Sequence, residues 1–300
     1  HKLKLITLYC FMLKGSIVAL ITPFENNTLK EDVYSKLIHY HMKNGTNGIV
    51  PGGTTGESPT LSHDEHKKII EIAVKECNGK IPVIAGTGSN STSEAVELSK
   101  YAEKAGSDAL LVVTPYYNKP TQEGLYQHYK KINDSVGIPI IIYNIPSRSV
   151  IDMSVETMTK LYELKNIIGV KDATGDLNRV DLQLKAMGKE FIQLTGNDDN
   201  ALEFNKRGGS GSISVTANIA AKLCSDFQNS CANGFKDSEK FDKILQPIHT
   251  AMFIESNPSP VKYAASILGM CSPEVRLPLV GVREETKKKI SDTLKEAKIL

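Results

Sequence analysis

Short apolar runs alternate with longer helical patterns along most of this chain. The runs, which are of strand type, occur at residues 16–21, 48–50, 82–85, 109–113, 139–143, 167–171, 191–194 and 211–214. They lack an alternation of apolar and polar residues, so both faces of each strand are expected to be buried, as in a parallel sheet covered by helices. Eight such strand–helix units in about 220 residues predict an α/β fold, the (β/α)8 TIM barrel. A doubly wound open sheet is the alternative, but no Gly-x-Gly-x-x-Gly follows the first run.

The two ends of the chain differ from this pattern. After Gly234 only helical patterns occur, at 238–253, 260–268 and 284–297. We therefore predict a barrel over residues 13–234 and a small C-terminal helical domain over 235–300. Residues 1–12 are basic and then apolar, as in a signal peptide, but no small-residue cleavage site follows. We interpret them as an N-terminal extension or an expression remnant.

Polar pairs mark several helix starts. The spacing Ser/Thr-x-x-Glu predicts capping boxes at Thr28/Glu31, Ser62/Glu65 and Ser91/Glu94. The eighth barrel helix is expected at about residues 217–232.

Composition excludes several classes of function. The chain has 36 basic and 34 acidic side chains, a formal charge of +2, which gives no argument for nucleic-acid or membrane partners. The five cysteines form no Cys-x-x-Cys, and His63 and His66 lack a third ligand, so no metal site is expected. Scattered cysteines of this kind are typical of reduced thiols in a cytoplasmic protein. No apolar run reaches about 18 residues, so no membrane span is expected.

One predicted strand ends on a lysine. The run at 167–171 is apolar until Lys171, and turn residues follow it. A lysine at the mouth of a buried strand can be held neutral, because burial disfavours the charged amine. Only a neutral amine attacks a carbonyl carbon, so Lys171 is a candidate Schiff-base lysine. Taken alone, a lysine that extends its amine to water is the more common case.

The ends of other predicted strands carry residues that suit the same chemistry, because the C-terminal ends of barrel strands form one face. A Gly-rich loop after the second strand presents Thr54 and Thr55, and tyrosines follow the fourth and end the fifth strand. Phenols can transfer protons, and Arg148 after the fifth strand can bind a carboxylate. Together with Lys171, this set predicts carbonyl chemistry on an α-keto acid. A phosphate cradle around the glycines at 208–211 is a weaker alternative, with Arg207 as the one basic residue beside it.

Several stretches resemble the dihydrodipicolinate synthase (4-hydroxy-tetrahydrodipicolinate synthase) family, which belongs to the pyruvate-dependent class I aldolases with N-acetylneuraminate lyase. The resemblance runs from about residue 13 to the C-terminus. It is carried by the stretches GTTGES (53–58), YYNKP (116–120), YNIPSR (143–148), GVK (169–171) and GSISV (211–215). The arginine of YNIPSR favours the synthase over the sialic-acid and sugar-acid lyases.

The resemblance implies a function and a set of residue roles. Such an enzyme, a lyase without metal or organic cofactor, condenses pyruvate with L-aspartate 4-semialdehyde through an imine on Lys171. It performs the first committed step of diaminopimelate and lysine biosynthesis. Tyr143 is then the general acid/base, with Thr54 and a Tyr117 that crosses a dimer interface completing a proton relay. Thr55 and the Ile213 backbone are expected to hold the pyruvate carboxylate, Arg148 the semialdehyde carboxylate, and the Gly196 carbonyl to lie near the imine.

The resemblance also implies a homotetramer built from dimers and feedback inhibition by L-lysine at the dimer interface. The residues at positions that match that second site are Ser58, Pro59, His63, His66, Asn90, Glu94 and Tyr116. Two alternatives stay open from the sequence. One is a lyase of the same superfamily, such as N-acetylneuraminate lyase or a 2-keto-3-deoxy sugar-acid aldolase. The other is a non-catalytic, ligand-binding barrel.

Overall fold

Eight parallel strands form the centre of the protein in a computed structural model, which describes residues 12–300. Neighbouring strands follow the order β4-β1-β10-β9-β8-β7-β6-β5. A parallel bridge between Ile49 and Val83 joins the two ends of this order, and the Ile49 N–H donates to the Pro82 carbonyl at 3.0 Å. The barrel is therefore closed, as predicted, and the open-sheet alternative is wrong. Its strands are β1 (Gly15–Ala19), β4 (Gly48–Val50), β5 (Ile84–Gly86), β6 (Ala109–Val113), β7 (Ile140–Asn144), β8 (Ile167–Asp172), β9 (Ile192–Thr195) and β10 (Gly211–Ser214).

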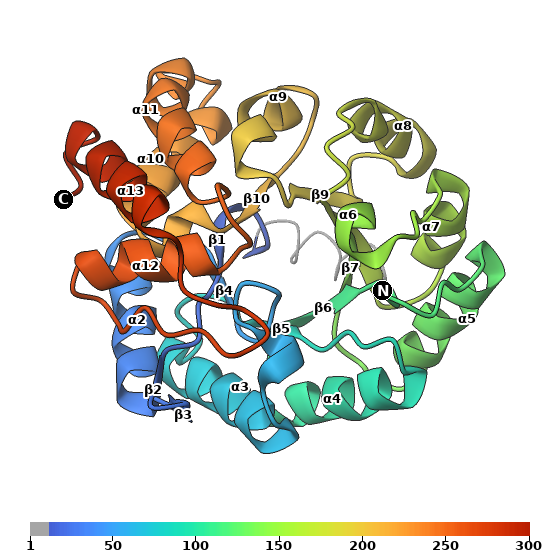
Figure 1. Cartoon of the computed structure of the whole chain (residues 1–300). Helices are drawn as coiled ribbons and strands as arrows, with labels where there is room; N and C mark the ends of the chain where they lie inside the picture. Colours follow the sequence, from blue (N-terminus) through green and yellow to red (C-terminus); the bar gives the residue numbers. More distant parts are fainter. Residues whose placement is uncertain (1–11) are drawn as a thin grey trace.

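Helices surround the strands (Figure 1). Each predicted run lies within two residues of an observed strand at its start and its end. The ring consists of α2 (Glu31–Lys43), α3 (His63–Cys77), α4 (Thr92–Ala105), α5 (Gln122–Asn133), α7 (Val155–Tyr162), α8 (Asn178–Met187), α9 (Ala201–Lys206) and α10 (Ala221–Ala232). Short elements between them are the hairpin β2 (Phe24–Glu25) and β3 (Thr28–Leu29), the turn of helix α6 (Pro146–Ser149), and the 3-10 turns η1 (Ser58–Thr60), η2 (Asp198–Asn200) and η3 (Thr216–Asn218).

The three predicted capping boxes have different outcomes. Ser62 and Glu65 form one at the start of α3, with both reciprocal hydrogen bonds present. The Thr28/Glu31 prediction is wrong, because Thr28 lies in β3 and Lys30 is the N-cap of α2. The Ser91/Glu94 box is not formed. Ser91 is the N-cap of α4, but its hydroxyl pairs with Ser93, and the Glu94 carboxylate bonds Ser89 and His63.

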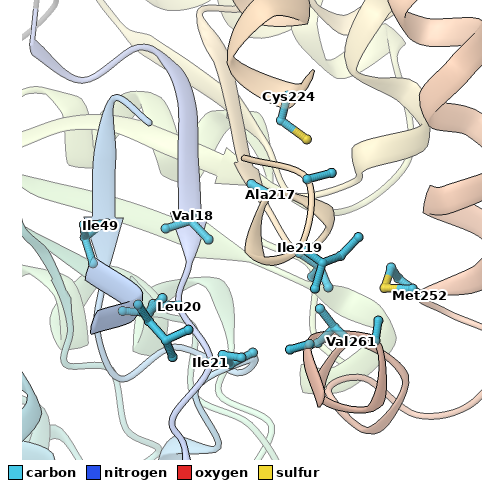
Figure 2. Packing of buried hydrophobic residues seen from close by; sticks show 14 of the residues in the cluster. Val18, Leu20, Ile21, Ile49, Ala217, Ile219, Cys224, Met252 and Val261 are labelled. Carbon is cyan, nitrogen blue, oxygen red and sulfur yellow. The ribbon is translucent and has the colours of Figure 1, made fainter. Parts of the chain in front are cut away.

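The C-terminal helices share a hydrophobic core with the beginning of the barrel. They are α11 (Ser238–Ala251), α12 (Ser259–Ile267) and α13 (Glu284–Glu296), grouped on one side of the ring beside α10 (Figure 1). Figure 2 shows this core, in which Val18 and Ile49 of the barrel belong to the same buried cluster as Met252 and Val261. The cluster also includes Ile290 and Leu294 of α13. The predicted boundary at residues 234/235 thus separates two parts that pack on each other through one continuous apolar cluster.

Two further sequence expectations concern the whole chain. Among residues 12–300, no helix is both long and apolar enough to cross a bilayer. Residues 1–11 of the expected N-terminal extension lie outside the described residues.

Candidate active site

Lys171 lies at the C-terminal end of β8, inside the mouth of the barrel. It is directly opposite Tyr143 in the parallel pairing of β7 and β8. Each of the two residues is only 6% exposed, and the Lys171 Nζ is 4.2 Å from the centroid of the Tyr143 ring. The strand residues before the lysine are apolar and buried, so the barrel core holds the stem of its side chain. The structure therefore brings together the two residues that the sequence singled out for imine formation and proton transfer.

Gly196 packs against the stem of Lys171. A Cβ atom added at Gly196 would lie 3.0 Å from the Lys171 Cε and 2.8 Å from the Ala173 Cβ. The Gly196 N–H also donates to the Asp172 carbonyl at 2.7 Å, which fixes the loop after β9 beside β8. A side chain at this position would overlap the Ala173 Cβ and crowd the Lys171 Cε, so the close approach favours glycine.

The loop after β4 carries the two threonines. The Thr54 carbonyl accepts the Glu57 N–H at 3.0 Å, and the Thr55 hydroxyl accepts the Asn257 Nδ2–H at 3.0 Å. Thr55 is 2% exposed, so its hydroxyl is a fixed group rather than a solvated one. Because β4 and β8 are parallel strands of one barrel, this loop and Lys171 lie at the same mouth.

A cavity of about 480 Å³ opens beside the lysine. Gly196, which packs against the Lys171 stem, lines the cavity together with Ala173 and Arg148. The Arg148 Nη2 donates to the Asn257 carbonyl at 3.3 Å. A cation thus faces a space next to a buried amine, an arrangement suited to a substrate that carries a carboxylate. The remaining lining residues are Ile145, Ser147, Asn197, Asp198, Asp199, His249, Thr250 and Phe253.

Ile213 lies in β10, paired with Ile17 of β1, and is 1% exposed. The chain just beyond it is held by Asp198, whose Oδ2 accepts the Val215 and Thr216 N–H groups at 2.9 and 3.1 Å. The buried Asp198 carboxylate therefore connects the segment after β9, which carries Gly196, to the segment after β10, the strand of Ile213.

Tyr117 does not join the other candidate catalytic residues of its own chain. Its side chain is 88% exposed, and its φ of 75° lies in the left-handed region that residues other than glycine rarely adopt. A strained backbone that presents an aromatic ring to solvent is a typical feature of a functional or contact position. A relay that includes Tyr117 therefore stays a prediction.

The second group of candidate residues is partly assembled around α3 and α4. The His63 Nε2 lies 2.8 Å from the Glu94 Oε1, and the Asn90 Nδ2–H donates to the Tyr116 carbonyl at 3.0 Å. A hydrogen bond from the Ser89 hydroxyl, followed by the contact with His63, lowers the pKa of Glu94, so this partly exposed group is a carboxylate at neutral pH. Ser58 and Pro59 lie in η1, just before α3.

His66 has a different environment from His63. It is buried, its Nε2 lies 2.7 Å from the Gly86 carbonyl, and burial lowers its pKa. A Cβ atom at Gly52 would come within 2.5 Å of the same nitrogen, so the ring supports the loop that carries Thr54 and Thr55.

Two residues of the site were not predicted from the sequence. Asn257 contacts both Thr55 and Arg148, but it stands in an irregular segment before α12, about two hundred positions from Thr55. His249 of α11 lines the cavity and lies 2.7 Å from the Thr216 hydroxyl through its Nδ1. Neither belongs to a motif, and only the packing of the C-terminal helices brings them to the barrel mouth. Within residues 12–300 no cluster of three or more His, Cys, Asp or Glu side chains could hold a metal ion.

Comparison with known proteins agrees with this geometry. The model of the Dihydrodipicolinate synthetase family matches residues 12–297. The 4-hydroxy-tetrahydrodipicolinate synthase of Pelagibacter ubique (strain HTCC1062) is 69% identical over 293 residues, covering 96% of this chain and all of the relative. A chloride-inhibited dihydrodipicolinate synthase from Acinetobacter baumannii, solved with pyruvate, superimposes with a TM-score of 0.94 at 43% identity and covers 96% of this chain and 100% of its own. The enzyme from Cyanidioschyzon merolae with lysine bound has a TM-score of 0.93 at 32% identity, over 96% and 99% of the two chains. The chain therefore belongs to the dihydrodipicolinate synthetase family.

Proposed function

We propose that this protein is a lyase that condenses pyruvate with L-aspartate 4-semialdehyde to give 4-hydroxy-tetrahydrodipicolinate, the first committed step of diaminopimelate and lysine biosynthesis. The observation that carries the proposal is the buried amine of Lys171 beside Tyr143, with Gly196 packed against the lysine stem and lining a cavity that also presents Arg148. The family membership and the relative solved with pyruvate support it. A non-catalytic barrel would have no use for this constellation, and the cationic Arg148 suits a short acceptor acid better than a long hydroxylated sugar acid.

The reaction begins at the keto carbon of pyruvate. The Lys171 amine attacks this carbon, and loss of water leaves an imine. The protonated imine withdraws electrons, so the pyruvate methyl group releases a proton and an enamine forms. No metal or organic cofactor is required, because the imine itself is the electron sink.

The second substrate then reacts with the enamine. The enamine carbon attacks the aldehyde carbon of the semialdehyde, a C–C bond forms, and the aldehyde oxygen takes up a proton to become a hydroxyl. The amine of the former semialdehyde attacks the imine carbon and displaces the Lys171 amine. We assign the proton transfers to Tyr143, relayed through Thr54 and Tyr117.

The remaining residues hold the substrates. Thr55 and the Ile213 backbone are proposed to bind the pyruvate carboxylate, and the Gly196 carbonyl to lie near the imine. Arg148 binds the carboxylate of the semialdehyde, for which its position on the cavity wall is suitable. Asn257 contacts Thr55 through its side chain and Arg148 through its carbonyl, and so connects the two substrate sites.

We also propose that the active unit is a dimer, assembled into a homotetramer, in which Tyr117 of one copy completes the relay of the other. The 88% exposure of Tyr117 and its left-handed backbone support this assignment. We expect the protein to act in the cytoplasm, where its free thiols at Cys77, Cys224, Cys231 and Cys271 stay reduced.

A second proposal concerns L-lysine as an effector. The pair formed by His63 and Glu94 offers a carboxylate that can bind an ammonium group. Asn90, in the loop before α4, donates to the carbonyl of Tyr116 in the loop after β6. The lysine bound to the relative from Cyanidioschyzon merolae supports it.

The first prediction tests the imine. Treatment with pyruvate and borohydride should reduce the imine and attach one pyruvate-derived group to Lys171, detected by intact mass and peptide mapping. Lys262 is the internal control, because it is buried as well but its amine is occupied by the Thr22 carbonyl and the Glu57 carboxylate. An unmodified protein, or an adduct on Lys262 instead, contradicts the proposed function.

The second prediction concerns the acceptor. Arg148→Ala should raise the KM for aspartate semialdehyde about tenfold to a hundredfold, since a charge-assisted hydrogen bond contributes roughly 1.5–3 kcal/mol. The rate of imine formation with pyruvate should change little. Arg207→Ala, which removes an exposed arginine paired with Asp181, is the control. Equal losses in both steps, or product formation with N-acetylmannosamine, argue for a different acceptor.

The third prediction tests the shared site. Tyr117→Phe should slow turnover about tenfold to a hundredfold through loss of a proton-transfer group, whereas Tyr126→Phe on α5 should not. Co-expression of Tyr117→Phe with Lys171→Met should restore about a quarter of wild-type activity, because half of the dimers contain one intact site. Activity no higher than that of the single variants places Tyr117 in its own chain's site.

The fourth prediction tests the effector. L-lysine should inhibit partially, and Glu94→Gln should weaken that inhibition about tenfold by removing the charge opposite the ammonium group. Glu97→Gln, on the exposed face of the same helix, should leave inhibition unchanged. A flat titration of the wild type to about 10 mM removes the effector proposal without affecting the catalytic one.

A further inference from the structure

Glu57 is a buried carboxylate within the loop that carries Thr54 and Thr55. The residue is 2% exposed and its φ is 57°, in the left-handed region. A buried carboxylate in a strained backbone persists only where its surroundings provide strong partners.

Both oxygens of this carboxylate bind groups from α12 or from the segment between α12 and α13. The Glu57 Oε2 lies 2.7 Å from the Lys262 Nζ, and the Oε1 accepts the Arg276 N–H at 3.0 Å. The side chains of Glu57 and Lys262 are 1% and 0% exposed, so neither charge is solvated. Burial lowers the pKa of Lys262, while the charge of Glu57 opposes that change.

The Lys262 amine also holds the segment next to the loop. It donates to the Thr22 carbonyl at 2.7 Å, and the Thr22 hydroxyl in turn donates to the Gly56 carbonyl at 2.7 Å. The same nitrogen lies 4.4 Å from the centroid of the Phe24 ring. One buried amine is thus connected to both Gly56 and Glu57, the two residues that directly follow Thr55.

These contacts reach the threonines through the backbone of the loop. The Glu57 N–H donates to the Thr54 carbonyl at 3.0 Å, and Asn257, five residues before Lys262, donates to the Thr55 hydroxyl. Stability alone is a weak reason for such a pair, because a buried ion pair is often no more stabilising than apolar side chains of similar volume. A better reason is geometric: the Glu57–Lys262 pair holds the loop that carries the Thr54 and Thr55 hydroxyls at the barrel mouth.

We infer that Lys262 is a positioning residue for the condensation proposed above: through Glu57 it sets the place of the Thr54–Thr55 loop at the pyruvate end of the site, without contact with substrate. The inference rests on the proposed function. It predicts that the pair controls the use of pyruvate more than the stability of the fold or the affinity for the semialdehyde.

The test is a set of variants assayed as full-length protein. In the neutral double variant Glu57→Gln/Lys262→Met both charges are removed together, so no unpaired charge stays buried. It should keep a thermal midpoint near that of the wild type. Its kcat/KM for pyruvate and its borohydride-trapping rate should fall about tenfold to a hundredfold, as expected for a displaced binding loop, with a smaller change in the KM for the semialdehyde.

Two further variants separate positioning from stability. Leu294→Ala removes a buried side chain of α13, far along the chain from the loop, and should lower the thermal midpoint without changing the pyruvate kinetics. Glu57→Gln alone preserves the shape of the side chain and should show the pyruvate defect even if the double variant does not fold.

Different results would contradict the role of Lys262 and the proposed condensation activity. A folded Glu57→Gln or double variant with wild-type pyruvate kinetics overturns the role of Lys262, and so does a pyruvate defect of the same size in Leu294→Ala. A wild-type protein that forms no trapped adduct with pyruvate overturns the proposed function itself.

Discussion

The close packing of one lysine stem inside the barrel mouth is the constraint on which the site depends. Lys171 has apolar strand residues behind it, the Tyr143 ring beside it and Gly196 against its Cε. This packing leaves the amine few positions, and Gly196, which contacts its stem, also lines the nearby cavity. The register of β7 and β8 places the lysine and tyrosine side by side, and a shift of one residue would point one of them to the opposite face of the sheet.

The barrel mouth is completed by segments that are not part of the barrel. Asn257 contacts Thr55 and Arg148, Lys262 holds Glu57, and His249 lines the cavity. All three come from the helical segments after residue 234, which cover one side of the ring (Figure 1). The C-terminal helices therefore have a role in the geometry of the site as well as in the apolar cluster that they share with β1 and β4.

The sequence predicted the barrel and its strands well, because strands buried on both faces are apolar throughout and stand out between helical patterns. It also placed Lys171, Tyr143 and Arg148 at strand ends, where parallel topology brings distant residues to one face. It could not supply contacts between segments that no periodicity relates. Asn257 and Lys262 look in sequence like ordinary helix-flanking and helical residues, and only tertiary packing reveals their partners. The Thr28/Glu31 spacing was misleading for a local reason, since Thr28 pairs with Glu25 in a hairpin.

The apolar cluster that joins Val18 and Ile49 to Val261 and Leu294 affects how the protein folds while it is being translated. The first strand leaves the ribosome long before the last helix, so the part of this cluster that α12 and α13 supply is added only when translation is nearly finished. Contacts between such remote segments also slow folding, because a long loop must close before they form. A nascent chain interrupted before Asn257 would have Lys171 but neither Asn257 nor Lys262, which hold the threonine loop, so catalytic competence should be acquired only near the end of synthesis.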